Sequence, residues 1–162
     1  MTLRERTYQW QDPAELATSS AQASGLDYLR AIMVGELPHP PVCATIGFRI
    51  TSVEEGRASI ELQPGEHQYN TIGTVHGSVI VAALDSAAGN AVHSTLPAGV
   101  GYTTVNLATT FLRTVHADSG TLRCDAVVLH GGRRIAVAEA RLKDASDRLV
   151  AHANATCMIL GP

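Results

Sequence analysis

The sequence has few aromatic residues and no long apolar run. Phenylalanine, tryptophan and tyrosine make up only 4% of the 162 residues, although hydrophobic residues reach 45%. The core therefore has to be built from valine, isoleucine, leucine and alanine. No stretch approaches the roughly 18 apolar residues of a membrane-spanning helix, so no membrane span is expected. The length fits one domain, and the hydrophobic content fits a folded, globular chain rather than a disordered one.

Cysteine is scarce as well. The three cysteines are odd in number and lack CxxC spacing: Cys43, Cys124 and Cys157. This pattern indicates free thiols in a reducing compartment rather than a disulfide scaffold. The first residues, MTLRERTYQWQDPAEL, contain no apolar segment typical of a secretory signal. We expect a cytoplasmic protein.

Clustered positive charge and metal-binding motifs are also missing. The formal net charge is −3 and the basic residues are scattered, so a nucleic-acid partner is not expected. The seven histidines show no HxH, HxxxH or HExxH spacing. The sequence thus predicts neither a metal site nor a bound cofactor.

The remaining pattern predicts helices and strands in a definite order. Residues 1–24 are polar and are expected to form a loosely attached extension, and residues 25–162 the folded domain. An amphipathic helix is predicted within 24–38, with Ser24 as its N-cap and Gly35 as its stop, and a hairpin within 44–64. Four further β segments are predicted, joined in sequence by turns into an antiparallel meander: 102–115, 120–132, 133–145 and 148–160.

Residues 76–99 differ from these segments because their apolar residues are continuous and rich in alanine. Continuous apolarity of this length, closed by Pro97 and Gly99, predicts a helix over about 76–95 that is buried on most sides. A flat sheet would cover only one side of such a helix. The order of elements therefore predicts an α+β fold in which an antiparallel sheet of five to six strands wraps around a long central helix.

The start of this helix raises a chemical question. The stretch NTIGTVHGSVIVAALD places Gly77 at the first turn and a lone carboxylate, Asp85, among apolar residues. The amide at a helix N-terminus lacks an intrahelical partner, so Gly77 is a candidate oxyanion donor. Asp85 is either a salt-bridged or solvated acid or a functional one, because a buried aspartate is rare unless it is paired.

Spacing limits how these two groups could cooperate. Eight residues rise about 12 Å along a helix, too far for one helix to bring its Gly77 amide and Asp85 to a single reacting carbon. Two antiparallel helices of a two-fold dimer would place the glycine end of one beside the acid of the other. We therefore expect any site here to be shared between subunits.

Residues 25–160 resemble the hotdog-fold acyl-CoA thioesterases of the PaaI (phenylacetic acid degradation) type. The resemblance rests on Asn70 six residues before the His-Gly pair, the HG-x7-D unit, the helix, and four antiparallel strands in the expected order. It implies hydrolysis of an acyl-CoA substrate to a carboxylic acid and CoA, without a further cofactor. It also implies a homodimer, and we expect two dimers to associate into a tetramer.

The resemblance also implies roles for individual residues. Asp85 would act as nucleophile or as general base on water, the Gly77 amide would polarise the thioester carbonyl, and Asn70 would help to position the carbonyl or the water. Thr103 or Thr104 matches the hydroxyl that hydrogen-bonds the acid or the water. The sequence departs from the commonest family pattern by reading Ser78 where a second glycine is usual.

Other candidates are weaker. His76 could hydrogen-bond the substrate or the backbone at the helix start, and we favour the structural role. No GxSxG motif surrounds Ser78, so a serine hydrolase is disfavoured. Arg113 and Arg133 are the best local cations for the CoA phosphates, since a guanidinium suits phosphate oxygens.

Two alternative functions remain open. A hotdog hydratase or dehydratase would need a histidine paired with an acid, and the spacing from Asp85 to His93 is too long for that within one chain. A non-catalytic acyl-CoA-binding module would typically lack the acid that this sequence retains at Asp85.

Overall fold

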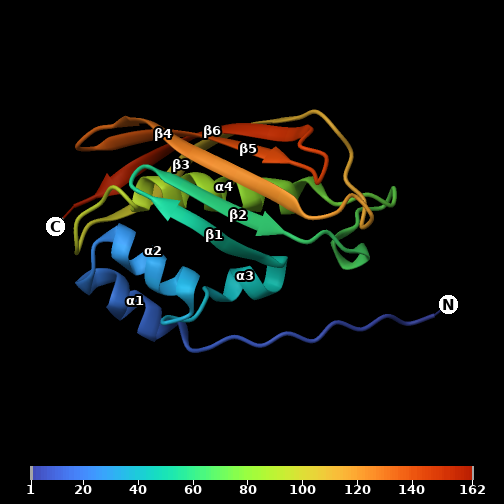
Figure 1. The fold of residues 1–162 in the computed structure, drawn as a ribbon, viewed down its shortest axis with the longest axis horizontal. Helices are drawn as coiled ribbons and strands as arrows, with labels where there is room; N and C mark the ends of the chain where they lie inside the picture. The colour runs from blue at the N-terminus through green and yellow to red at the C-terminus, as the bar shows by residue number, and fades with distance from the viewer. Residues whose placement is uncertain (1, 162) are drawn as a thin grey trace.

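A six-stranded antiparallel sheet surrounds a central helix in the computed structural model, which describes residues 2–161 (Figure 1). The strand order is β1-β2-β4-β5-β6-β3. The strands are β1 Phe48–Glu54, β2 Arg57–Leu62, β3 Gly101–Phe111, β4 Leu122–Gly131, β5 Ile135–Lys143 and β6 Leu149–Leu160. The expected hotdog architecture, with a long helix against a curved antiparallel sheet, is confirmed.

The central helix is α4, Gly77–His93, close to the expected 76–95. Its sheet-facing residues are alanine-rich, and Ala83, Ala87 and Ala91 have no exposed surface. The sheet presents small residues in return, such as Ala138 on β5 and Ala153 on β6, both fully buried. Small side chains on both surfaces let the helix pack close to the strands, and this contact forms the core that the composition predicted.

Strand β3 does not lie where the predicted meander puts it. Strands β4, β5 and β6 are sequential neighbours, but β3 pairs with β6 and forms one edge of the sheet. The turn signal at 117–120 does not close a hairpin, because residues 112–121 form a long connection from β3 to β4. Such a length allows the chain to cross from one edge of the sheet to an interior strand.

The N-terminal part is more ordered than the sequence indicates. Helix α2, Gly25–Val34, confirms the predicted amphipathic helix, with Ser24 as N-cap and Gly35 in the left-handed region at φ 83°. Within the segment expected to be a loose extension, residues 13–22 form α1 (Pro13–Gln22), capped by Asp12 and anchored by the buried Leu16. The helix α3, Pro41–Ile46, precedes β1, so the hairpin begins four residues later than predicted, and a 3-10 turn, η1, spans Glu66–Gln68.

None of the helices in the described part of the chain is long and apolar enough to cross a membrane.

A close backbone contact ties α2 to the C-terminal end of α4. The Gly25 N–H donates to the carbonyl of Leu96 at 3.0 Å, and a Cβ at Gly25 would overlap the carbonyl oxygen of His93. Because the obstacle is backbone, it cannot move aside as a flexible side chain would. Glycine is therefore required for α2 to seat against α4.

We expect Gly25→Ala to lower the free energy of unfolding by about 1–3 kcal/mol, because the added methyl forces α2 away from α4. Urea unfolding of the two proteins measures the difference. Gly131→Ala is the matched control, since a Cβ there meets no atom within 4 Å. Equal stabilities of the Gly25 variant and the wild type would contradict this packing account.

Candidate active site

Helix α4 begins with an unusual cap. His76 is the N-cap residue, and its Nδ1 accepts from the Ser78 N–H at 3.0 Å, the role that serine, threonine or aspartate commonly has. The Ser78 hydroxyl lies 2.7 Å from the same nitrogen. The imidazole is thus engaged with the helix start, which agrees with the structural role favoured from the sequence.

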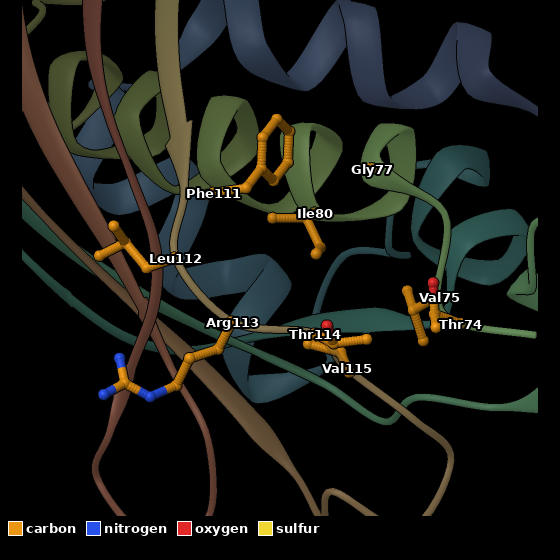
Figure 2. Close-up of a pocket in the computed structure, with 9 residues that line it drawn as sticks. All are labelled: Thr74, Val75, Gly77, Ile80, Phe111, Leu112, Arg113, Thr114 and Val115. Carbon is orange, nitrogen blue, oxygen red and sulfur yellow. The ribbon is translucent and has the colours of Figure 1, made fainter. Parts of the chain in front are cut away.

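Gly77 is the first residue of α4, and its N–H has no hydrogen-bond partner among residues 2–161. It borders a cavity of about 360 Å³, shown in Figure 2, together with the Phe111 ring, which lies 3.4–3.5 Å from the position a Gly77 Cβ would take. The cavity is lined by Thr74, Val75, Gly77, Ile80, Phe111, Leu112, Arg113, Thr114 and Val115. A free amide at a helix N-terminus, open to a cavity, can donate to an oxygen that gains negative charge.

Arg113 lines the same cavity but extends away from Gly77 (Figure 2). Its Nη1 donates to the carbonyl of Leu149 at 2.7 Å, and its side chain is exposed. The guanidinium therefore keeps donors for an anion at the rim of the cavity. Arg133, in contrast, is an exposed residue of the turn between β4 and β5 and does not line this cavity.

Asn70 organises the loop that leads to α4. Its Oδ1 accepts from the N–H groups of Ile72 at 3.0 Å and Thr74 at 3.1 Å, and its Nδ2 donates to the Thr74 hydroxyl at 2.8 Å. This is the side-chain-to-backbone turn typical of asparagine. One amide hydrogen of Asn70 remains for another acceptor, so the residue supports the loop whether or not it also contacts a substrate.

Asp85 lies in the middle of α4 and is half-buried. Its Oδ1 is shielded from solvent and has no hydrogen-bond partner within residues 2–161. The side chain separates a cavity of about 300 Å³ on one side from a more open groove of about 650 Å³ on the other. A buried carboxylate oxygen without a partner is costly, so its position between two openings keeps Asp85 a candidate for a functional acid.

The two threonines at the start of β3 point to opposite faces of the sheet. Thr104 lines both openings beside Asp85, and its hydroxyl lies 3.9 Å from the Cys157 sulfur. Thr103 is exposed on the other face. Of the two alternatives that the sequence left open, the geometry favours Thr104 as the hydroxyl near the acid.

The structure groups these candidates into two places rather than one. Asp85 shares its groove with Ser78 and Thr104, whereas Gly77 and Arg113 share the cavity at the helix start. Eight residues of α4 separate Gly77 from Asp85, about 12 Å of helix rise. One chain alone does not bring the two groups to a common point.

The sequence did not predict a binding role for the residues on the far side of Asp85. The smaller cavity is lined there by Tyr28 of α2, Tyr102 of β3, and Ser86, Asn90 and His93 of α4. The three α4 residues could have been found, because their i, i+4, i+7 spacing places them together on one face of the helix, next to the face that carries Asp85. Tyr28 and Tyr102 carry no such signal, since they come from other elements.

Within the part of the chain that the structure describes, no group of three His, Cys, Asp or Glu side chains is placed to hold a metal ion.

Comparison with known proteins gives consistent results. The family model described as Thioesterase superfamily matches residues 72–151. A protein assigned as an esterase in Saccharolobus solfataricus is 30% identical over 115 residues, 71% of this chain and 80% of that protein. A 1,4-dihydroxy-2-naphthoyl-CoA hydrolase of Listeria monocytogenes is 27% identical over 71% of this chain and 92% of its own length.

A solved structure from Ralstonia eutropha, described as a phenylacetic acid degradation-related protein, superposes with a TM-score of 0.74 at 33% identity. The match covers 81% of this chain and 98% of that one. The agreement extends over almost the whole of that fold.

The buried position of His93 in the wall of the cavity beside Asp85 predicts that the free energy of unfolding depends on pH. Burial lowers the pKa of His93 in the folded chain, whereas in the unfolded chain the imidazole takes up a proton near pH 6.5. We expect the free energy of unfolding to be highest above about pH 6.5 and to fall as the pH decreases toward the folded pKa. His93→Gln is expected to make this fall shallower in urea unfolding measured across that range.

Burial also lowers the pKa of His39 and His67, so some slope remains in the His93 variant. His130→Gln, at an exposed position of β4, serves as the matched control and is expected to keep the wild-type slope. A His93 variant with the wild-type slope would rule out this source of the pH dependence.

Proposed function

The chain belongs to the thioesterase superfamily, and from this premise we propose that it hydrolyses an acyl-CoA to a carboxylic acid and free CoA. In this proposal the Asp85 carboxylate acts as the general base or the nucleophile. The observation that carries the proposal is the buried, unpartnered Oδ1 of Asp85 between a cavity and an open groove. The activity named for the Listeria monocytogenes relative, hydrolysis of a CoA thioester, supports the substrate class.

The proposed reaction needs only a carboxylate and an oxyanion donor, since a thiolate is a good leaving group. The Asp85 carboxylate either takes a proton from the attacking water or attacks the carbonyl carbon itself, and water then hydrolyses the resulting anhydride. In both routes a C–O bond forms, the C–S bond breaks, and the CoA thiolate leaves and takes up a proton. Thr104 lies beside the acid, where its hydroxyl can orient the water.

The Gly77 N–H is the proposed oxyanion donor. It is free of other hydrogen bonds within the described residues and carries the positive end of the α4 dipole. Removing a single donor of this kind from an enzyme typically costs about 10²–10³ in kcat. Asn70 would assist by holding the loop, and its remaining amide hydrogen is available to the carbonyl or the water.

We infer that the site is shared between two subunits. Strand β3 is an 11-residue edge strand that has no neighbour on one side within residues 2–161, and its Val105 is 53% exposed. Long open edges are pairing surfaces. Pairing two β3 edges about a two-fold axis would set two α4 helices antiparallel, with Gly77 of one chain near Asp85 of the other.

The remaining candidates have supporting roles in this proposal. Arg113 and Arg133 would contact the CoA phosphates, Arg113 from the rim of the Gly77 cavity. His76 would act through its cap of α4, and Ser78 would line the groove where the substrate approaches. A further association of two dimers into a tetramer remains a prediction.

We expect Asp85→Asn to lower acyl-CoA hydrolysis by at least 100-fold, because the amide can neither accept the water proton nor attack the carbonyl. Thiol release from acyl-CoA measures the rate. Asp118→Asn is the matched control: Asp118 lies in an exposed turn, and its variant is expected to keep the wild-type rate. Near-normal turnover by the Asp85 variant would refute the proposed chemistry.

Two inactive variants test whether the site is shared. Gly77→Pro removes the proposed oxyanion donor with little strain, because proline is favoured at the first helical position and His76 already has φ −64° and ψ 141°. A dimer of one Gly77→Pro subunit and one Asp85→Asn subunit keeps one intact shared site. Co-expression in equal amounts should therefore restore about a quarter of the wild-type activity, since half of the dimers are mixed and half of their sites intact.

If each site lies within one chain, every site in the mixed dimers carries a defect and no activity returns. The activities of the two variants expressed separately are the controls for this comparison.

A further inference from the structure

We propose that Gln68 is a positioning residue for the site: its buried amide anchors the base of the loop that carries Asn70, and thereby directs the N–H of Gly77. The inference rests on the proposed function, because it concerns the oxyanion donor of the same site. Gln68 lines neither the cavity at Gly77 nor the two openings at Asp85, so it acts through other residues rather than on the substrate.

Gln68 is a buried polar residue of the turn η1. Only 7% of its surface is exposed, although glutamine is found mostly at protein surfaces. Its Nε2 donates to the carbonyl of Ile46 at 2.7 Å, and its Oε1 accepts from the Gly65 N–H at 3.0 Å. One partner is an acceptor and the other a donor, so together they fix the orientation of the amide. The side chain therefore ties the loop before α4 to the C-terminal end of α3.

The end of α3 is a firm anchor. Gly47, which follows α3, lies in the left-handed region at φ 94°. The Arg6 guanidinium donates to the carbonyls of Ala44 and Thr45, at 2.7 Å each. The last three carbonyls of α3 therefore all accept from side chains, two from Arg6 and one from Gln68. Such contacts satisfy groups that a helix end otherwise leaves unpaired.

The backbone of Gln68 closes the loop that leads to α4. Its carbonyl accepts from the His76 N–H at 2.9 Å, and the next pair inward, Tyr69 and Val75, forms an antiparallel β-bridge. These two pairs turn residues 69–75 into a closed loop with Gln68 and His76 at its base. Anchoring the Gln68 side chain therefore fixes both sides of that base.

Both groups proposed to bind the thioester oxygen are attached to this base. Asn70 follows Gln68 by two residues, and the N–H of Gly77 belongs to the peptide that follows His76. The carbonyl of that same peptide accepts from the Val79 N–H at 3.0 Å. With the His76 N–H held by Gln68, the peptide is fixed on both sides and the Gly77 N–H points in one direction. An oxyanion donor is effective when it is preorganised in this way.

The far side of the loop is held independently of Gln68. Two hydrogen bonds connect it to the chain after β3: the Val75 N–H to the Val115 carbonyl at 2.9 Å, and the Ala117 N–H to the Tyr69 hydroxyl at 2.8 Å. These bonds remain when the Gln68 amide is lost, but they do not fix the His76 peptide. A substitution at Gln68 should therefore disturb the direction of the Gly77 N–H more than the fold.

Gln68→Glu and Gln68→Met test this role. The first keeps the shape of the side chain but replaces the donor to the Ile46 carbonyl by an oxygen, and the second removes both side-chain hydrogen bonds. We expect each to lower kcat by about tenfold or more and to change KM less than about threefold, because a misdirected donor is lost mainly in the transition state. Thiol release from phenylacetyl-CoA and hexanoyl-CoA measures both constants. Gln63→Met, at an exposed glutamine of the preceding segment, is the matched control and should keep the wild-type kcat.

A double-mutant cycle shows whether Gln68 acts through the Gly77 N–H. That N–H is absent in Gly77→Pro, so adding Gln68→Glu to this variant is expected to lower kcat less than about twofold further. A further loss as large as that of Gln68→Glu alone would mean that the two residues act independently. Urea unfolding of each variant shows that the kinetic constants are those of folded protein.

Hydrogen exchange tests the same geometry without a substitution. Relative to its intrinsic rate, the His76 N–H of the wild-type protein should exchange at least about tenfold more slowly than the Gly77 N–H. The Gln68 carbonyl holds the first, and no acceptor within residues 2–161 holds the second. This measurement decides the inference if neither Gln68 variant folds.

A wild-type kcat in both Gln68 variants, independent effects in the cycle, or equal protection of the two N–H groups overturns this inference and leaves the proposed function standing. Wild-type activity of Gly77→Pro overturns the assignment of the oxyanion donor together with this inference. Hydrolysis of neither acyl-CoA by the wild-type protein overturns this inference and the proposed function alike.

Discussion

The close packing of α4 on the sheet is the contact on which the rest of the molecule depends. Four alanines of the helix, Ala83, Ala87, Ala88 and Ala91, have no exposed surface. Any larger side chain at these positions would lift the helix from strands that present alanines of their own, and interiors tolerate such overpacking poorly. Because this seam fixes the rotation of α4 about its axis, it also fixes which residues face away from it. Asp85 and the groove beside β3 lie on that remaining side.

The placement of the acid conflicts with stability. A carboxylate oxygen that is buried without a partner lowers the free energy of unfolding, and an apolar residue at position 85 would suit the surrounding helix better. Proteins retain such costs mainly at functional sites. Among residues 2–161, the N–H of Gly77 likewise lacks a hydrogen-bond partner. Asp85 and Gly77 both belong to α4, so the proposed function rests on this helix.

The sequence predicts those features that follow from local pattern. Continuous apolarity located α4 within two residues, the Ser24 cap and Gly35 stop located α2, and β-rich segments separated by turn signals located the strands. Helix α1 escaped detection because a single buried residue, Leu16, anchors it. The pairing of β3 with β6 escaped because turn residues report which strands are joined and not which edges meet. For the candidate site, the helix-start amide and the acid could be read from spacing, whereas Tyr28 and Tyr102 reach the cavity only through tertiary packing.

The two ends of the proposed site rest on different parts of the chain, a backbone N–H at Gly77 and a side chain at Asp85. The Gly77 end depends on backbone, namely an unpaired amide and a loop held by Asn70, so it places few demands on side-chain chemistry. Asp85, in contrast, would act through its side chain, which borders a cavity lined by residues of α2, α4 and β3. The proposed chemistry would therefore depend on one carboxylate, that of Asp85, and on one backbone N–H, that of Gly77.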